Sequence, residues 1–544
     1  MTATATLGGL SPWLWMAAGV AALLLLLLLW PTRNRRNDQQ RRSNAVHWSW
    51  WLRWWLLGES QGEPPLVRGW LPWVGVLPAF AKDAGNLLFR CKERHGDVFT
   101  LIVAGQRLTF LTDPACYGQI FKAKKELLSF RQLAEDVSDK AFALPVHEIP
   151  PEKEQVLARQ YITCLQGEEL GALTLNMQRH LHHIFVQQLL MAPKQAAEKK
   201  NEGDNGWRTG HLFEFVTRVM NEAGIKTVFG EECWSESMLQ QHLTFDGGFP
   251  LLVAGMPKWM AKKPIAAREA LWNLFLEAFS PSTKGKHDDA SRLIREREEM
   301  FGRESPDQAL LLSKLHTSIL WAAQANTVPA TFWTIAYLLN DPSAKQSIQQ
   351  ELDDVLSTVH PSSSLKELNI TNAATEDLFF KERAEMNQLQ RLESAISEAL
   401  RLTSGGLTGR KVLVNQELTL RTTGRSYKLR AGDHLSLYPY LSHRDPEIYT
   451  EAERFVFDRF LSPATAELPF LPFGGGISQC PGRFFARNEI KLFVALFLRC
   501  FEVELLLPTA LSLDDPRWPQ LDQSRVGLGI LPPTFDIPFR FRLR

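Results

Sequence analysis

The sequence predicts a mainly α-helical protein with a small β part, built as a single large domain behind an N-terminal transmembrane helix. Three observations lead to this fold class: an uncharged apolar run at residues 13–30, a helical pattern of apolar residues beyond about residue 129, and short strand-like runs at 97–112 and 411–440. The chain has 544 residues, of which 45% are hydrophobic and 22% are charged, as is ordinary for a globular protein.

The first element is the apolar run at residues 13–30, and no charged residue precedes Arg33. As a helix this run would be roughly 27 Å long, close to the thickness of the hydrocarbon core of a bilayer. Basic residues follow the run instead of preceding it, so the positive-inside rule places the rest of the chain in the cytosol. We therefore expect a membrane anchor at residues 1–32, with a cleaved signal peptide as the alternative.

A basic and tryptophan-rich linker, residues 33–61, follows the expected anchor. Eight of the 17 tryptophans of the chain lie at or before Trp55, five of them within the stretch WSWWLRWWLL at residues 48–57. Tryptophan prefers the headgroup region of a bilayer, where its ring is partly buried and its N–H stays hydrated. We expect an interfacial membrane contact here, and an ordinary core segment is the alternative.

Residues 62–544 have the composition of one continuous globular domain. Prolines at 64 and 65 predict an extended start, because each disfavours helix in the residue before it. Residues 97–103 and 106–112 flank Ala104-Gly105 and predict a β-hairpin. Helices are expected from about residue 129, separated by polar loops near 194–206, 281–288 and 356–375, before the strand-like runs return.

Net charge and cysteine usage narrow the classes of partner. A formal net charge of +1 offers no bulk electrostatic argument for nucleic acid, and none is expected as a partner. The six cysteines lie far apart and form no C-x-x-C pair, which favours a reduced compartment over a disulfide-rich scaffold.

The stretch LPFGGGISQCPGRFF at residues 471–485 carries the chemistry. A phosphate loop would need a Lys-Ser or Lys-Thr after its glycines, and a zinc or iron–sulfur site would need further ligands nearby. Neither is present in this stretch, which leaves a single thiolate, Cys480. The run at 483–500 is helical in pattern, so the helix dipole would favour an anionic sulfur at its start. The glycines at 474–476 permit a tight bend and the close approach of a flat cofactor.

The pattern Phe473-Gly474-x-Gly476-x-x-x-Cys480-x-Gly482 resembles the haem-binding loop of the cytochrome P450 family, the haem-thiolate monooxygenases. The resemblance implies haem b bound through the Cys480 thiolate as iron ligand, and a cytochrome P450-type domain over residues 62–544. It also implies electrons that come from NADPH through a reductase. Ser478 departs from the pattern, since the family usually has Arg or His there to bind a haem propionate. Arg410 matches the family's propionate-binding arginine and is expected to compensate.

A second family motif is the pair Glu398-x-x-Arg401, whose i,i+3 spacing puts both charges on one face of a helix. The spacing alone is weak, because Glu451-x-x-Arg454 shows it too. The first pair precedes a stretch at 455–460 that resembles the family's P-E-R-F region. Glu398, Arg401 and Arg459 are therefore expected to form a buried charge network with a structural role, since buried charges persist only when they satisfy one another.

A third stretch, residues 320–333, resembles the long helix that crosses over the haem. Most of the superfamily has an acid–threonine pair there, whereas this chain has Ala325 and Asn326 followed by Thr327. Pro329 has no N–H and crowds the carbonyl four residues before it, so we expect a kinked helix with a free Ala325 carbonyl that can hold a water. Asn326, which both donates and accepts hydrogen bonds, is expected to organise protons with that carbonyl and Thr327.

The amino-acid sequences of this helix and of residues 521–533 resemble those of the sterol and bile-acid branch of the family. This branch includes cholesterol 7α-monooxygenase, the oxysterol 7α-hydroxylases and prostacyclin synthase. The resemblance implies a membrane-bound sterol hydroxylase, most specifically at the 7α position of cholesterol or an oxysterol. An endoperoxide isomerase of the prostacyclin-synthase type is one alternative, and a haem- or lipid-binding protein without turnover is another. The expected walls of the substrate pocket are Trp321, Val328, Leu528 and Ile530.

The same resemblance implies a location and partners. The protein is expected in the endoplasmic reticulum membrane as a single-pass protein with a cytosolic domain, where it would meet its sterol substrate and NADPH–cytochrome P450 reductase. Three basic residues after the cysteine are candidates for the reductase-docking face, although such charges are most often simply solvated: Arg483, Arg487 and Lys491.

Overall fold

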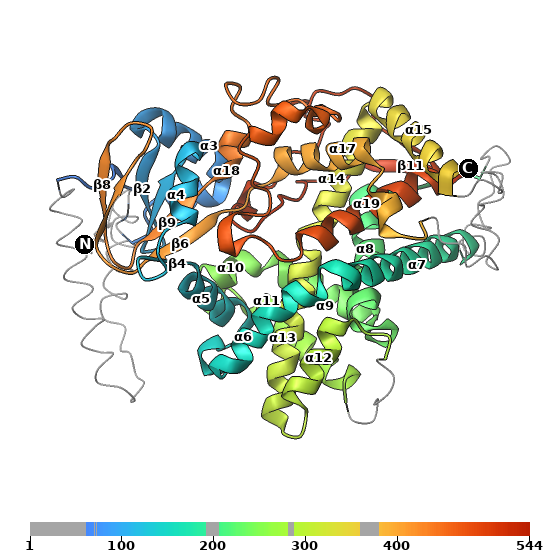
Figure 1. Cartoon of the computed structure of the whole chain (residues 1–544), viewed down its shortest axis with the longest axis horizontal. Coiled ribbons are helices and arrows are strands. Elements are labelled where there is room, and N and C mark those ends of the chain that lie inside the picture. Colours follow the sequence, from blue (N-terminus) through green and yellow to red (C-terminus); the bar gives the residue numbers. More distant parts are fainter. Residues whose placement is uncertain (1–60, 70, 72, 192–205, 281–287, 360–379) are drawn as a thin grey trace, which may run out of the picture. The chain divides into compact units, whose positions relative to one another are not determined.

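Helices make up most of the computed structural model, which describes residues 61–191, 206–280, 288–359 and 380–544, apart from Trp70 and Pro72 (Figure 1). The helices are α3 (Leu77–His95), α4 (Tyr117–Phe121), α5 (Phe130–Phe142), α6 (Pro151–Cys164), α7 (Gly167–Met191), α8 (Leu212–Phe229), α9 (Glu236–Gly247), α10 (Phe249–Val253), α11 (Lys262–Ala278), α12 (Arg292–Phe301), α13 (Pro306–Gln324), α14 (Thr327–Asn340), α15 (Pro342–Val359), α16 (Arg383–Met386), α17 (Gln390–Thr403), α18 (Pro439–His443) and α19 (Arg483–Cys500). The strands are β1 (Leu66–Val67), β2 (Val98–Val103), β3 (Gln106–Leu111), β4 (Leu128–Ser129), β5 (Arg208–His211), β6 (Thr408–Val412), β7 (Gln416–Thr419), β8 (Ser426–Leu429), β9 (His434–Leu437), β10 (Phe501–Leu505) and β11 (Pro538–Leu543).

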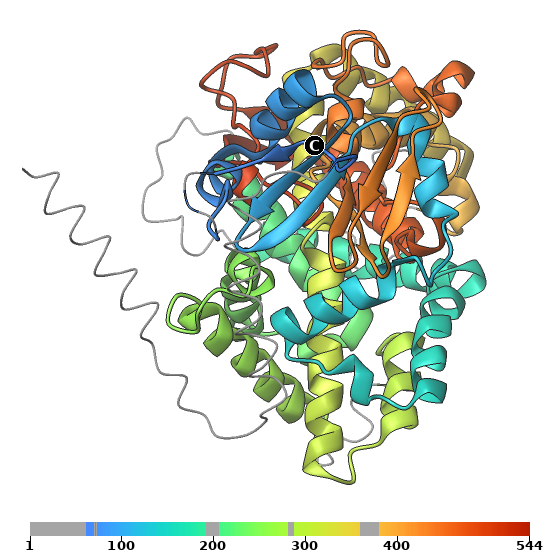
Figure 2. The ribbon, with the colours of Figure 1, turned by 90° about the vertical axis from the view of Figure 1, so that its left-hand side faces the viewer.

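The larger sheet of the described chain contains six strands in the order β1-β2-β3-β9-β6-β4. Its hairpin β2–β3 pairs Val103 with Gln106 across Ala104-Gly105, which confirms the predicted hairpin. Strand β9 runs parallel to β3, and β6 runs antiparallel to β9 with Arg410 opposite Leu435. Figure 1 shows these strands on one side of the helical part, and Figure 2 views them from the front. The sheet thus presents β6, and with it Arg410, from a rigid element.

Helix α19 follows the cysteine loop and lies in the interior, packed against α7, α14 and α17 (Figure 1). Its residues from Asn488 to Leu498 are all buried, including the polar Asn488, Glu489 and Lys491. The predicted helix at 483–500 is confirmed. Because α19 is held on several sides, the residues just before it, including Cys480, start from a fixed position.

The helix expected over residues 320–333 is two helices. Helix α13 starts with a capping box between Ser305 and Gln308 and ends at Gln324, and α14 starts at Thr327. The break therefore lies at Ala325 and Asn326, upstream of the proline. Pro329 falls in the first turn of α14, where a backbone N–H would have no intrahelical partner. The sequence predicted the irregularity, but as a kink within one helix.

The expected anchor at residues 1–32 and the tryptophan-rich stretch at 48–57 lie outside the described residues. Within the described ranges, no helix combines the length and apolar character needed to cross a bilayer. The described residues belong to one compact unit. Its main apolar core is built largely from α7, α8, α14, α17 and α19.

Candidate active site

Hydrogen bonds between backbone groups of the same loop fix the shape of the cysteine loop. The Cys480 N–H donates to the Phe473 carbonyl at 3.0 Å, and the Gly474 N–H donates to the Leu471 carbonyl at 3.2 Å. Gly474 and Gly476 have φ angles of +69° and +65°, in the left-handed region that L side chains rarely adopt. Glycine is therefore required at both positions for the chain to turn back toward α19.

At Gly475 and Gly476 the backbone closely approaches the side chain of Phe121. A Cβ atom at Gly475 would lie 2.5 Å from the ring of Phe121, and one at Gly476 would lie 2.9 Å from the Cβ of Phe121. The residues of this stretch that face the cavity beside Cys480 are Leu471, Pro472, Phe473, Gly474, Ser478, Pro481, Gly482 and Phe485. Gly476 does not line the cavity, so its role is to shape the loop.

Cys480 has open surface although it lies deep in the fold, because that surface faces the cavity. Burial raises the pKa of its thiol, and the backbone N–H groups of Gly482 and Arg483 together with the Arg483 charge oppose this rise. These groups stand at the first turn of α19, where donors point out of the helix. The arrangement suits a sulfur that carries negative charge once a cation binds it.

The cavity next to Cys480 has a volume of about 650 Å³ and is lined mainly by apolar residues. This volume is in the usual range for the binding of a small molecule or cofactor. A recess of about 720 Å³ lies elsewhere, between α14 and residues 444–455 and 510–514, and no cysteine lines it. Of the residues predicted to contact substrate, Trp321, Leu528 and Ile530 line the Cys480 cavity.

Two of the residues expected around the break between α13 and α14, Ala325 and Val328, do not line this cavity. Val328 is buried in the main core and is not among the residues that line the cavity. Its neighbour Thr327 faces the cavity instead, since consecutive residues of a helix point about 100° apart. Ala325 also lies outside the lining, although no donor to its carbonyl is found among the described residues, as its position four residues before Pro329 predicts.

Asn326 lies at the break between α13 and α14 and faces the cavity. Its side-chain Oδ1 accepts a hydrogen bond of 2.8 Å from the Ile530 N–H. The Thr327 hydroxyl donates to the Ala323 carbonyl at 2.8 Å, so its proton is already engaged. The Asn326 Nδ2 has no partner among the described residues, which makes it the free donor of this segment.

Asp246, on α9, was not predicted, yet it orients two parts of the cavity wall. Its Oδ1 accepts hydrogen bonds from Trp321 Nε1 at 2.8 Å and from Arg525 Nη2 at 2.7 Å. The Trp321 ring also stacks on Phe249, with centroids 3.9 Å apart and planes 9° apart. One carboxylate thus fixes an aromatic wall on α13 and the loop that leads to Leu528. No local pattern marks Asp246, because its partners come from distant segments.

Arg410 is 4% exposed and forms no ion pair among the described residues. Its Nη2 donates to Ser478 Oγ at 2.6 Å and its Nη1 donates to the Gly409 carbonyl at 2.8 Å. Ser478 lines the cavity, and its hydroxyl also donates to the Gly475 carbonyl at 3.2 Å. Burial lowers the pKa of Arg410, as expected for a cation without a counter-charge.

A buried cation is rarely left without an anion, because its desolvation is then uncompensated. Arg410 and the cavity-lining Ser478 therefore suit a ligand that brings its own carboxylate. A haem fits this demand, since its propionates would meet Arg410 while its iron met Cys480. The residues present fit the group.

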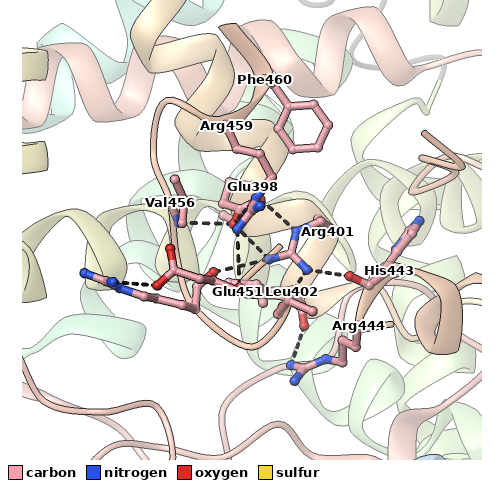
Figure 3. A network of polar contacts seen from close by, with 12 residues as sticks. Glu398, Arg401, Leu402, His443, Arg444, Glu451, Val456, Arg459 and Phe460 are labelled. Atoms are coloured by element: carbon pink, nitrogen blue, oxygen red, sulfur yellow. Dashed lines mark hydrogen bonds and ion pairs between the residues drawn. The ribbon is translucent and has the colours of Figure 1, made fainter. Parts of the chain in front are cut away.

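The charges at Glu398, Arg401 and Arg459 come together in one buried network (Figure 3). Arg401 donates to both Glu398 oxygens at 2.8 Å, and Arg459 Nε donates to Glu398 Oε1 at 2.9 Å. The two arginines use their remaining donors on backbone carbonyls, among them those of Ala452 and Thr450. Every charge is therefore paired, as burial requires.

His443, which the sequence reasoning missed, connects this network to the cysteine loop. Its backbone carbonyl accepts a hydrogen bond from Arg401 Nη1 (Figure 3), and its ring Nε2 accepts one of 3.1 Å from the Leu471 N–H. Burial, with the nearby Arg401 charge, lowers the pKa of His443 to about 3. The ring is therefore neutral at physiological pH and keeps Nε2 as an acceptor for the start of the loop.

Glu489 on α19 was also missed. It is 1% exposed and lines the cavity, and its Oε1 has no hydrogen-bond partner among the described residues. Burial raises the pKa of its carboxyl well above the usual value. The periodic pattern that predicts a buried α19 also predicts that position 489 is buried. It does not predict that the carboxyl at this position has no hydrogen-bond partner.

Two of the basic residues considered for reductase docking are engaged inside the protein. Arg487 donates to Glu393 and to Ser397 Oγ, and Lys491 is buried with its Nζ 2.8 Å from Glu393. Burial alone would raise the pKa of Glu393, but Arg487 and Lys491 outweigh it and lower that pKa. Neither residue offers a free charge to a partner.

Comparison with known proteins agrees with this geometry. Residues 64–526 match the family described as Cytochrome P450. Cytochrome P450 7A1 of Rattus norvegicus is 33% identical over 518 residues, which cover 90% of this chain and 96% of the relative. Cholesterol 7-alpha-monooxygenase of Cricetulus griseus is 33% identical over 509 residues (89% and 94% covered), and prostacyclin synthase of Homo sapiens is 31% identical over 515 residues (89% and 94% covered).

Proposed function

The chain belongs to the cytochrome P450 family and is a haem-thiolate monooxygenase, and from this premise we propose that it hydroxylates a sterol. The most specific form of the proposal is the 7α position of cholesterol or of an oxysterol. The observation that carries it is a single cavity of about 650 Å³ in which the Cys480 thiol faces a mainly apolar wall. The names and near full-length similarity of the relatives support the same substrate class.

Haem held by Cys480 supplies the activation of oxygen, with electrons delivered by a reductase. The chain's own part begins with holding the group: Cys480 as iron ligand, and Arg410 with Ser478 toward its carboxylates. The Gly482 and Arg483 amides stabilise the negative sulfur. The Glu398 network fixes the loop through His443 and the Leu471 N–H.

We propose that protons are delivered to the cavity at the break between α13 and α14. Asn326 lines the cavity and its Nδ2 has no partner among the described residues, so this amide is suited to hold a water that carries protons. The Ala325 carbonyl likewise has no donor in the described part of the chain, because Pro329 has no N–H, but it lies outside the cavity lining. The Thr327 hydroxyl already donates to Ala323 and can therefore only accept.

Substrate binding is assigned to the apolar part of the wall. Trp321, Leu528 and Ile530 present hydrophobic surface, and Asp246 fixes two of the segments that carry them. A sterol is a rigid apolar ligand that buries well against such a surface. We further propose a single-pass endoplasmic reticulum location with the anchor at residues 1–32, which would bring the domain to a substrate that partitions into the bilayer.

The experiment for this proposal has two stages. The purified protein, reduced and given carbon monoxide, should show the red-shifted Soret band of a thiolate-ligated haem, and Cys480→Ala should abolish it. Conversion of cholesterol or oxysterols should then require both NADPH and reductase. Product formed equally well without NADPH would refute the hydroxylase assignment.

An endoperoxide isomerase is the second candidate, because prostacyclin synthase of Homo sapiens is 31% identical to the chain over a similar span. Such an enzyme would need neither oxygen nor electrons from a reductase. Prostaglandin endoperoxide, tested without NADPH beside the sterol panel, separates the two. Asn326→Ala sharpens the test, since a hydroxylase would keep the spectrum but consume oxygen without forming product.

A further inference from the structure

Glu489 is the only carboxylic acid among the described residues that line the Cys480 cavity. The other ionisable side chains of that wall are those of Tyr161 and Cys480. Glu489 is 1% exposed, and its Oε1 has no hydrogen-bond partner in the described part of the chain. A buried acid without a partner is costly, so its presence in a cavity wall points to a role in the chemistry of that cavity.

No charged group holds Glu489 in one protonation state. On the same helix, Arg487 donates to Glu393, and Lys491 Nζ lies 2.8 Å from Glu393. The side chains that α7, α13, α14 and α17 contribute to the cavity wall carry no charge. Burial is the one cause of the raised pKa of Glu489. Glu489 can therefore release and take up a proton without breaking an ion pair.

The helices place Glu489 toward the same end of the cavity as the break between α13 and α14. On α19 the residues that line the cavity end at Glu489 and Ile490, and on α14 they end at Thr327 and Ala330. Beyond these positions neither helix lines the cavity, and the two helices pack against each other. The break itself offers no acid, since residues 325 and 326 are alanine and asparagine.

We propose that Glu489 is the acid that supplies protons to the cavity, through water held at the Asn326 amide. A monooxygenase consumes two protons and two electrons for each O2, because one oxygen atom enters the product and the other leaves as water. The proton passes from the Glu489 carboxyl to the water and on to the reduced oxygen, and the carboxylate then takes up a proton from solvent. The electrons come from the reductase.

Burial suits Glu489 to this role. An acid is most effective when its pKa lies near the operating pH, and burial moves the pKa of Glu489 upward from its usual acidic value. The inference rests on the monooxygenase activity, and it deepens the proposed function by naming the source of its protons. It depends on the proposed sterol substrate only for the assay of product.

The first test compares full-length wild type with Glu489→Gln, which keeps the size of the side chain but has no acidic proton. With cholesterol or an oxysterol and NADPH, the variant should form product about 100-fold more slowly, at the lower end of what a positioned acid contributes. The wild-type rate should fall as pH rises through the pKa of Glu489, and the variant should lack this step. Hydrogen peroxide already carries two protons and two electrons, so both proteins should use it equally well.

Glu222→Gln is the matched control. It makes the same chemical change at a buried carboxyl on α8, which lies 2.8 Å from Lys226 Nζ and does not line the cavity. It should match wild type with NADPH and with hydrogen peroxide. Glu489→Asp keeps an acid and should recover part of the NADPH-driven rate. Equal NADPH-driven rates in Glu489→Gln and wild type, or an equal loss with hydrogen peroxide, would overturn the inference.

A second measurement needs no substrate. In mildly acidic buffer, the infrared difference spectrum between wild type and Glu489→Gln should show the carbonyl stretch of a protonated carboxyl. This band should shift in D2O faster than the protein oxidises NADPH, because the acid must recover its proton from solvent. A missing band, or one that exchanges more slowly, would overturn the inference. If wild type oxidises neither sterol by either route while its carbon monoxide spectrum is intact, the proposed sterol function fails, and the infrared result alone decides the role of Glu489.

Discussion

Arg410 is a buried cation whose charge no carboxylate neutralises among the described residues, because its hydrogen-bond partners are a hydroxyl and a carbonyl. We predict that Arg410→Ala lowers haem retention by roughly 10- to 100-fold, the equivalent of one or two charge-assisted hydrogen bonds. The ratio of haem absorbance to protein absorbance after gel filtration measures it.

Ser478 provides the control for this prediction. Ser478→Ala removes one hydrogen bond to Arg410 but keeps the cation, so it should retain most of the haem. Ser478→Arg in the Arg410→Ala background places a cation at a position that lines the cavity and should restore haem in part. Equal haem content in Arg410→Ala and wild type would show that another group binds the carboxylates.

The buried Glu489 carboxyl leads to a prediction about how the stability of the protein depends on pH. Its pKa is raised in the folded state by burial, whereas in the unfolded chain it is near 4.3. The protonated carboxyl therefore favours folding below the unfolded pKa, and this contribution is lost as pH rises toward the folded pKa. Glu489→Gln should change stability little at pH 5 and gain over wild type as pH rises to 8, as measured by thermal unfolding.

Glu393 is the matched control of opposite sign. Arg487 and Lys491 lower its pKa in the folded protein, so its contribution is present above the unfolded pKa and lost as pH falls. Glu393→Gln should therefore lose stability, and more at pH 7 than at pH 4. Parallel stability curves for Glu489→Gln and wild type across pH would mean that Glu489 has a partner that the structure does not describe.

At the scale of elements, the break between α13 and α14 anchors the cavity wall at residues 525–531. Asn326 accepts from Ile530, Trp333 Nε1 donates to the Leu531 carbonyl at 2.7 Å, and Arg525 binds Asp246. The irregular helix thus serves as an attachment point. Asn326 stands at the N-terminus of α14 without using its side chain to cap that helix, so its Oδ1 is available to the Ile530 N–H.

Gly529→Ala tests this attachment. An alanine there would have to adopt a φ of +125° and would collide with Asn326 Oδ1, so we expect a loss of stability and weaker ligand-induced spectral shifts. Gly432→Ala is the control, because Gly432 has a φ of +91° but open space around a Cβ. Gly432→Ala should lower the free energy of unfolding by only the conformational cost of a positive φ, about 1–3 kcal/mol, as measured by thermal unfolding. Its ligand-induced spectral shifts should equal those of wild type. Equal ligand shifts in both variants would contradict the attachment.

Elements with a local signal were predictable from the sequence, and their contacts were not. The hairpin at Ala104-Gly105 and the helix from residue 483 follow from turn chemistry and periodicity. The place of Val328 could not be read from the sequence, because a pattern of apolar residues does not distinguish a cavity wall from a core. Asp246 was missed because its partner Arg525 is 279 residues away in the chain.

At the scale of the whole molecule, membrane attachment is expected to depend on the first 32 residues. A variant that lacks residues 1–32 should become extractable from membranes by alkaline carbonate, because the remaining chain would have no apolar run long enough to span a bilayer. Membrane fractionation followed by immunoblotting measures it.

Any attachment that remains in this variant should resist buffer but not carbonate, as interfacial binding does, and should depend on the tryptophans at residues 48–55. Replacing those tryptophans by serine in the full-length chain is the complementary control and should leave carbonate resistance unchanged. Carbonate resistance of the variant without residues 1–32 would assign the anchor to another segment.

The sequence by itself determined the class of fold and placed Glu398 and Arg401 on one face of a helix, because these depend on residue types at fixed local spacings. Cys480 as haem ligand and Arg459 as a partner of Glu398 followed from the family resemblance. Only the tertiary structure decided what stands around the cavity. It placed Ser404 beside Ile530, joined Ile530 to Asn326 across 204 residues of chain, and set Asp246 between two segments of the wall. The physical reason is that periodicity states which face of an element is buried, whereas the atom that meets a given side chain is set by how distant elements pack.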